Sequence, residues 1–281
     1  MVAEALAWVD PTVSCELRII TTIGDESPQD LAALGGEGVF VSAIEAALAH
    51  SSVDLAVHSF KDVPSGQLPG LSTAYLPRGD ARDALVTRSG WLLADIEPGS
   101  VIGTGSPRRR ALLLDMRPDL RVEPLRGNVD TRLRRVAEGA VDGAILAAAG
   151  LERLDRLDEV ADLFDVERFV PAVGQGIIAI QSSDASSELR DLLAQIDDAE
   201  TRTCAEAERA AARELEAGCR VPMGTHARLQ DGTLRIDAFI EVDDRLHRVQ
   251  RTGSPSDAEA LGRSVGVELK AAAGESRPAS A

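Results

Sequence analysis

Nine arginines lie between residues 103 and 135, in a stretch with no lysine and only four acids, although the formal net charge of the chain is −16. Guanidinium groups bind carboxylates and phosphates through paired hydrogen bonds. An acidic protein is poorly suited to nucleic acid, because binding a polyphosphate backbone needs a broad basic surface. The stretch therefore predicts a local site for a small molecule rich in carboxylates, and no nucleic-acid partner.

The segment "GTGSPRRR" (103–110) has the pattern of a strand end followed by a helix start. Ser106 suits the N-cap and Pro107 the first helical position, which leaves backbone N–H groups and the positive end of the helix dipole facing a ligand. Arg108 and Arg109 lie beside that terminus, so the segment predicts an anion site. The alternative is that both arginines belong to a solvated helix face.

The segment "PLRGNVDTRLRR" (124–135) repeats this pattern. Arg126 lies in a turn after a strand, and Asp130 or Thr131 is expected to cap a helix that carries Arg132. A second anion site is therefore predicted at this turn. Two later arginines of the same helix are expected to face solvent, because each residue turns the helix by about 100°: Arg134 and Arg135.

The segment "AVHSFKDVP" (56–64) places three polar residues, Ser59, Lys61 and Asp62, just beyond an apolar strand. A carboxylate at the carboxyl end of such a strand is well placed to meet a ligand. The alternative is that Lys61 and Asp62 form a surface ion pair in a turn. His58, on the strand itself, is interpreted as a hydrogen-bonded structural residue.

The segment "ELEAGCRVPMG" (214–224) puts Cys219 in a loop after a helix that ends at Gly218. A loop cysteine can be an attachment nucleophile, whereas the alternative is a small buried hydrophobe. Cys15 and Cys204 bring the number of cysteines to three, without the C-x-x-C spacing of a metal site. This pattern predicts reduced thiols and no metal.

Short apolar runs alternate with segments of helical spacing through the first two-thirds of the chain, which predicts α/β layers with largely parallel sheets. The expected strands lie at 17–22, 54–59, 83–88, 100–105, 143–150 and 176–181, and the expected helices at 40–50, 106–118 and 130–139. The Gly- and Pro-rich segment "PAVGQG" (171–176) is interpreted as a hinge that returns the chain to the first sheet.

A different pattern begins near residue 198. A long alanine-rich helix (199–218) precedes an antiparallel meander (226–253) with tight turns at Asp231-Gly232 and Asp243-Asp244, and a last helix (256–272) covers it. The predicted domains are 1–78 with 176–196, 82–170, and 199–275. With no membrane-length apolar run and no leader pattern, a cytoplasmic protein is expected.

Six stretches in this order resemble the hydroxymethylbilane synthase (porphobilinogen deaminase) family: "AVHSFKDVP", "GTGSPRRR", "LRGNVDTRL", "AAAGLERL", "VPAVGQG" and "AERAAARELEAGCRVPMG". The resemblance implies two α/β lobes like periplasmic binding proteins and a small α+β domain. It further implies a monomeric transferase of heme biosynthesis. Such an enzyme joins porphobilinogen units, with loss of ammonia, into a linear tetrapyrrole whose rings each carry an acetate and a propionate.

The resemblance also implies residue roles. Asp62 matches the catalytic aspartate, which holds pyrrole N–H groups and stabilises a cationic azafulvene, and Cys219 matches the thioether attachment of a dipyrromethane cofactor. Further cofactor contacts match Ser59, Lys61, Thr104, Ser106, Arg108 and Arg109. Positions that bind substrate or the growing chain match Arg126, Arg132, Arg153 and Gln175.

Departures from the family pattern fall in the first sixth of the chain. Glu37 and Ala33 stand where many members have loop lysines, and Ile23 replaces an arginine. The first strand of the family, which supplies an arginine and a serine, precedes the part matched here, so a truncated and poorly active form is expected. The alternative function is that of a catalytically impaired homologue or a two-lobed small-anion-binding protein.

Overall fold

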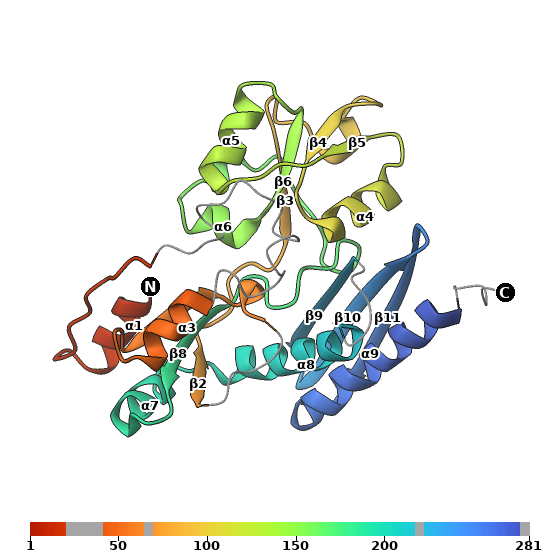
Figure 1. The fold of residues 1–281 in the computed structure, drawn as a ribbon. Helices are drawn as coiled ribbons and strands as arrows, with labels where there is room; N and C mark the ends of the chain where they lie inside the picture. Colours follow the sequence, from red (N-terminus) through yellow and green to blue (C-terminus); the bar gives the residue numbers. More distant parts are fainter. Residues whose placement is uncertain (21–41, 65–69, 217–221, 276–281) are drawn as a thin grey trace. The chain divides into compact units, whose positions relative to one another are not determined.

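The computed structural model describes residues 1–20, 42–64, 70–216 and 222–275. The chain divides into two compact units, which are shown in Figure 1: unit 1 holds residues 1–78 and 177–203, and unit 2 holds residues 79–176 and 204–281. Within the described ranges, no helix is long and apolar enough to cross a membrane.

Unit 1 is built on a three-stranded sheet in the order β1-β8-β2. The elements are α1 (Val2–Val9), α3 (Ser42–Ala49), β1 (Leu55–Ser59), the 3-10 turn η1 (Phe60–Asp62), β2 (Leu71–Tyr75), β8 (Ile178–Ser183) and α7 (Ser187–Ala194). The buried side chains of Leu6, Ala74, Ile180 and Leu193 join α1 and α7 to the sheet. Strand β8, green in Figure 1, thus lies among elements that precede it by about a hundred residues.

The expectation of largely parallel sheets is wrong for unit 1. β8 pairs antiparallel with both β1 and β2. The reason is that β8 enters between them after the long excursion through residues 79–176, and the direction of that return is a tertiary property. The strand expected at 17–22 is also wrong in its described part: residues 17–20 have no regular structure, and Leu17 and Ile19 are 88% and 84% exposed. These two side chains gain no burial, so nothing stabilises a strand there.

Unit 2 contains a five-stranded mixed sheet in the order β5-β4-β6-β3-β7. Strand β4 is parallel to both of its neighbours, whereas β3 is antiparallel to both of its own. The strands are β3 (Asp83–Thr87), β4 (Val101–Gly103), β5 (Arg121–Glu123), β6 (Gly143–Ala147) and β7 (Asp162–Leu163). The helices are α4 (Pro107–Met116), α5 (Val129–Ala137) and α6 (Ala148–Glu152), with short turns η2 (Leu93–Asp95) and η3 (Leu157–Glu159). Buried clusters that include Leu112 of α4 and Leu133 of α5 pack these helices against the sheet.

The C-terminal part of unit 2 confirms the predicted meander. It comprises α8 (Ala199–Glu216, in unit 2 from Cys204 on), β9 (Met223–Gln230), β10 (Thr233–Val242), β11 (Arg245–Gly253), η4 (Pro255–Asp257) and α9 (Ala258–Glu275). Both hairpin turns have positive φ at their two central residues: Asp231 with Gly232, and Asp243 with Asp244. This is the backbone that two-residue hairpins require.

Helices α8 and α9 approach each other closely on the face of that sheet. A Cβ atom at Gly262 would lie 2.0 Å from the carbonyl oxygen of Ala207, and one at Gly266 would lie 2.6 Å from that of Ala211. Only glycine fits at these two positions. The alanine-rich sequence of α8 is therefore explained by backbone contact rather than by side-chain interdigitation.

The fold class predicted from the sequence, α/β with a smaller α+β part at the C-terminus, is confirmed. The three sheets fall into two compact units, because the mixed sheet and the C-terminal sheet belong to one of them. The division into domains 1–78 with 176–196, 82–170, and 199–275 stays a prediction.

Candidate active site

In unit 1, the turn after β1 presents two charged side chains to solvent. Phe60 is buried and packs edge-to-face on Tyr75, with the ring centroids 5.0 Å apart. Its backbone N–H donates to the carbonyl oxygen of Ile177 at 3.0 Å. Because Phe60 anchors the turn, Lys61 and Asp62 are held exposed at the carboxyl end of the strand, and Ser59 is the last residue of that strand.

His58 lies on β1 and is 7% exposed. Burial lowers the pKa of this imidazole, although its hydrogen bond with Gln181 and the negative charge of Asp62 act in the opposite direction. Burial is the largest of these effects, so the net shift is downward. This agrees with a structural interpretation of His58.

In unit 2, helix α4 begins as its sequence predicts. The Ser106 hydroxyl accepts a hydrogen bond from the Arg109 backbone N–H at 3.4 Å, and Pro107 is the first helical residue. The Thr104 hydroxyl is buried and accepts from the Ser106 N–H at 3.2 Å. The N-cap thus fixes the direction in which the side chains of the first turn leave the helix.

Arg108 and Arg109 are not on a solvated face: each is only 5% exposed. Both form ion pairs with Asp83, which is fully buried at the start of β3. The Arg108 Nη2 atom lies 2.8 Å from one carboxylate oxygen and the Arg109 Nη2 atom 2.7 Å from the other. Arg109 also donates through Nε to Asp83 at 2.9 Å and through Nη1 to the carbonyl of Ile145 at 2.8 Å.

Asp83 is a site residue that the sequence analysis did not identify. A signal was present, because an acid opens a run that is otherwise apolar through Val86, and a carboxylate in a buried strand requires a cation or several donors. Burial by itself raises the pKa of Asp83, but the charges of Arg108 and Arg109 outweigh that effect and hold the pKa below its usual value.

The cluster of Asp83 with the two arginines carries more positive than negative charge. One carboxylate faces two guanidinium groups. Burial lowers the pKa of Arg108, and the neighbouring charge of Arg109 acts in the same direction, whereas Asp83 opposes both. The Arg108 Nε atom is a buried donor that has no hydrogen-bond acceptor among the described residues. Surplus charge and an unused donor suit an anionic ligand.

Gln175 binds Asp83 of this cluster directly, and Arg153 binds the backbone of the residue that follows Gln175. Gln175 is 1% exposed, and its Nε2 donates to the carbonyl of Ala81 at 2.7 Å and to Asp83 at 3.1 Å. Arg153 donates through Nη2 to the carbonyl of Gly176 at 2.8 Å. Partial burial lowers the pKa of Arg153, opposed by the charge of Glu152.

The second predicted anion site, at the start of α5, differs in its cap. Asn128, not Asp130 or Thr131, is the N-cap, and its side chain accepts from the Thr131 N–H at 2.9 Å. The N-cap therefore lies two or three residues earlier than the sequence analysis expected. The two later arginines, Arg134 and Arg135, are exposed as predicted.

Arg126 and Arg132 lie at this second helix start. Arg126 is exposed just before the turn, and Gly127 has a φ of +105°, where a side chain would be strained and would meet Thr131. Arg132 is half-buried and donates through Nε to the carbonyl of Gly127 at 2.8 Å. The turn thus orients Arg132 towards its own helix mouth.

The remaining predicted site positions lie outside the described residues. These are Cys219 and the departures Ile23, Ala33 and Glu37. Of the other two cysteines, Cys15 is an exposed free thiol and Cys204 is buried. In the part of the chain that the structure describes, no three His, Cys, Asp or Glu side chains are grouped to hold a metal ion.

The structure therefore brings together, in unit 2, Thr104, Ser106, Arg108, Arg109 and Gln175 around Asp83, with Arg153 attached through Gly176. The fold and this cluster define an α/β protein with a site suited to a small organic anion. Residues 1–191 match the family described as "Porphobilinogen deaminase, dipyromethane cofactor binding domain", and residues 202–271 match "Porphobilinogen deaminase, C-terminal domain". The chain belongs to the porphobilinogen deaminase family.

Several curated relatives align with this chain over nearly its full length. Porphobilinogen deaminase of Syntrophobacter fumaroxidans is 45% identical over 272 residues, which cover 95% of this chain and 88% of the relative. That of Sorangium cellulosum is 43% identical, with coverages of 95% and 92%. Among solved structures, the periplasmic VFT2 domain of Bordetella pertussis BvgS is 19% identical, with a TM-score of 0.35, and the alignment covers 56% of this chain and 66% of that domain.

Proposed function

We propose that this chain condenses porphobilinogen units, with release of ammonia, into the linear tetrapyrrole hydroxymethylbilane. The observation that carries this proposal is the match of both family domains to residues 1–191 and 202–271. The buried arginine cluster supports it, because a chain of pyrroles is a polycarboxylate and the cluster has surplus positive charge. The test is formation of hydroxymethylbilane from porphobilinogen by the purified protein.

The residues around Asp83 fit the cofactor of this family. Dipyrromethane carries carboxylates, and the unused Nε donor of Arg108 and the surplus charge of Arg108 and Arg109 suit such groups. In the proposal these two arginines hold the cofactor together with Thr104, Ser106, Ser59 and Lys61. When bound through Cys219, the cofactor supplies the primer to which porphobilinogen units are added.

Asp62 is the proposed catalytic residue. Its exposed carboxylate, fixed by the anchored turn after β1, holds the pyrrole N–H groups of the substrate. When ammonia leaves porphobilinogen, the remaining azafulvene is cationic, and a preorganised carboxylate stabilises this developing charge. Arg126, Arg132, Arg153 and Gln175 are the proposed ligands of the substrate and of the elongating chain.

Replacing Cys219 with serine is expected to remove the cofactor. The intact mass of the wild-type protein should exceed that of the polypeptide by one dipyrromethane, and the Cys219→Ser protein should have the bare mass, because serine cannot form the thioether. Cys15→Ser is the matched control, since Cys15 is an exposed free thiol. An adduct that persists in Cys219→Ser and is lost in Cys15→Ser would overturn this assignment.

Replacing Arg126 or Arg132 with leucine is expected to stop elongation early, so that intact mass spectrometry shows enzyme with one or two added units. Each lost charged hydrogen bond to a carboxylate weakens binding by about 1.5 to 3 kcal/mol. Arg135→Leu is the control on the same helix, since Arg135 is exposed and lies beyond the helix mouth. Equal effects of all three substitutions would show a general effect of charge instead of a site.

The second candidate function is binding of a small anion without turnover. The arginine cluster alone would serve it, and a protein that binds porphobilinogen but forms no bilane would establish it. We further propose that the enzyme works as a monomer. We also propose that it works in a reducing compartment such as the cytoplasm, which the exposed free thiol of Cys15 supports.

A further inference from the structure

The backbone of residues 170–176, here named the hinge segment, fixes the orientation of three side chains of the candidate site. Arg108 donates through Nη1 to the carbonyl of Val170 at 2.7 Å, and Arg153 donates to that of Gly176 at 2.8 Å. Gln175, within the segment, reaches Ala81 and Asp83. A shift of this segment would therefore move donors at both of its ends and in its middle.

The hinge segment lies directly against strand β9 of the C-terminal sheet. A Cβ atom at Gly224 would lie 2.7 Å from the carbonyl oxygen of Pro171 and 2.9 Å from that of Val170. The two backbones thus touch without side chains between them. Val170, at the start of the segment, is also buried in one apolar cluster with Phe239 of β10. Apolar packing therefore fixes the start of the segment, and hydrogen bonds fix its later residues.

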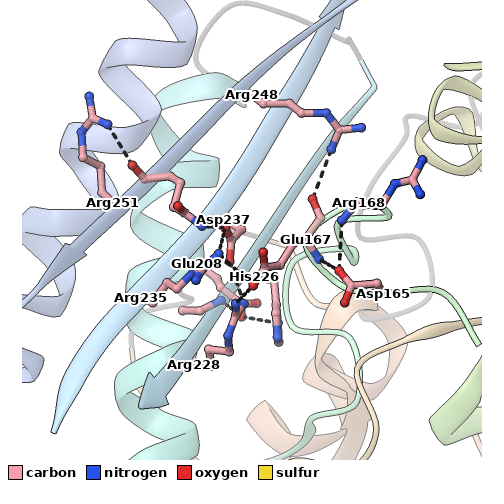
Figure 2. Close-up of polar contacts among 12 residues, drawn as sticks. Asp165, Glu167, Arg168, Glu208, His226, Arg228, Arg235, Asp237, Arg248 and Arg251 are labelled. Carbon is pink, nitrogen blue, oxygen red and sulfur yellow. Dashed lines mark hydrogen bonds and ion pairs between the residues drawn. The ribbon is translucent and has the colours of Figure 1, made fainter. Parts of the chain in front are cut away.

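Glu208 of α8 supplies hydrogen bonds to both sides of this contact. Its side chain is fully buried; Oε2 accepts from the Gly174 N–H at 2.6 Å, and Oε1 accepts from the Ala227 N–H of β9 at 2.8 Å. His226 Nδ1 lies 3.6 Å from Oε1. The side chains of Glu208 and His226 are both drawn in Figure 2. Gly174 has a φ of +72°, a left-handed conformation that a glycine adopts readily.

A buried carboxylate is costly unless its oxygens receive good donors, and hydrogen bonds to a charged acceptor are the stronger kind. Glu208 meets this condition by binding one backbone N–H of the hinge segment and one of β9. The residue was not singled out by the sequence, where it stands among alanines in "AEAERAAAR".

We propose that Glu208 is a positioning residue: it holds the hinge segment against β9 and so sets the orientation of Arg108, Gln175 and Arg153 towards an anionic ligand. The inference rests on the proposed function for the identity of that ligand. Glutamine cannot replace Glu208, because its amide has one acceptor oxygen and would turn an NH2 group towards the second backbone N–H.

The test compares Glu208→Gln with two controls in bilane formation from porphobilinogen. We expect the KM of Glu208→Gln to rise roughly tenfold with a much smaller change in kcat, because misplacing Arg153 and Gln175, the proposed substrate ligands, weakens the binding of substrate and transition state alike. Glu206→Gln, on an exposed position of the same helix, should leave KM unchanged. Ile236→Val, in the buried core of the C-terminal sheet, should lower the melting temperature without raising KM.

A purely structural role would raise KM in Ile236→Val as much as in Glu208→Gln at equal loss of melting temperature, and that result would overturn the proposal. If Glu208→Gln does not fold, Glu208→Asp keeps the charge and both oxygens and is expected to fold with a smaller rise in KM; an unchanged KM in this variant also overturns the proposal.

Amide hydrogen exchange tests the positioning role of Glu208 independently of the proposed function. Even if the wild type forms no bilane, residues 170–176 should exchange faster in the Glu208 variant than in Ile236→Val, and equal exchange in both would refute the positioning role.

Discussion

Asp62→Asn is expected to slow bilane formation by at least about a hundredfold, the scale of losing one preorganised electrostatic contact to the transition state. The substitution keeps the size of the side chain and removes its negative charge. Because Asp62 is exposed and the turn that carries it is anchored by Phe60, the melting temperature should change little. The measurement is the rate of bilane formation from porphobilinogen, with thermal melting of both proteins.

Asp54→Asn is the matched control for this prediction, because Asp54 is an exposed acid just before the same strand. It should retain the wild-type rate. Asp62→Glu keeps the charge but displaces it, and an intermediate rate is expected. Near-normal turnover of Asp62→Asn would refute charge stabilisation by this residue.

Asp83→Asn is expected to destabilise the protein by about 3 to 5 kcal/mol, the usual cost of removing one partner from a buried ion pair. The substitution leaves the buried guanidinium groups of Arg108 and Arg109 without a counter-charge. The expected fall in melting temperature is roughly 6 to 20 °C for a unit of this size. Retention of the cofactor, read from the intact mass, should fall as well, because both arginines lose the group that orients them.

Asp119→Asn is the control, since Asp119 pairs with Arg117 at 2.6 Å but is partly exposed. Exposed pairs contribute about 0 to 1 kcal/mol, so its melting temperature should stay close to that of the wild type. An Asp83→Asn protein that melts with the wild type would show that the arginines are compensated elsewhere.

The stabilising effect of Asp83 also has a defined pH range. The folded-state pKa of this carboxyl lies below its ordinary value, so its contribution is fully present above the unfolded-state pKa of about 3.9. It is lost as the pH falls through the folded-state pKa. The difference in free energy of unfolding between the wild type and Asp83→Asn should therefore be constant from pH 8 to pH 5 and decrease below about pH 4.

Features that depend on neighbouring residues could be predicted from the sequence. The start of α4 at Ser106 and Pro107 and the hairpin turn at Asp231 and Gly232 follow from local backbone preferences. The cap of α5 could not be placed to the residue, because Asn128, Asp130 and Thr131 all offer a suitable oxygen and only the observed geometry distinguishes them.

Features that depend on distant parts of the chain could not be predicted. Arginines next to one another in a helix look like a solvated face until the acid that pairs with them is known, and Asp83 lies 26 residues before Arg109. Strand direction fails for the same reason, since β8 is placed by the return of the chain from unit 2. Glu208 could not be identified from the sequence for the same reason, because its two hydrogen-bond donors lie 34 and 19 residues away.

The central place of β8 in the sheet of unit 1 has a consequence for synthesis on the ribosome. β1 and β2 emerge early, yet among the described strands the one that joins them is made about a hundred residues later. Until then both strands expose edges, whereas the five strands of the mixed sheet are contiguous in the chain and can pair as they emerge. The sheet of unit 1, whose first strands are synthesised early, is therefore completed after the mixed sheet has formed. Chaperone binding is expected to concentrate on the nascent residues before position 79.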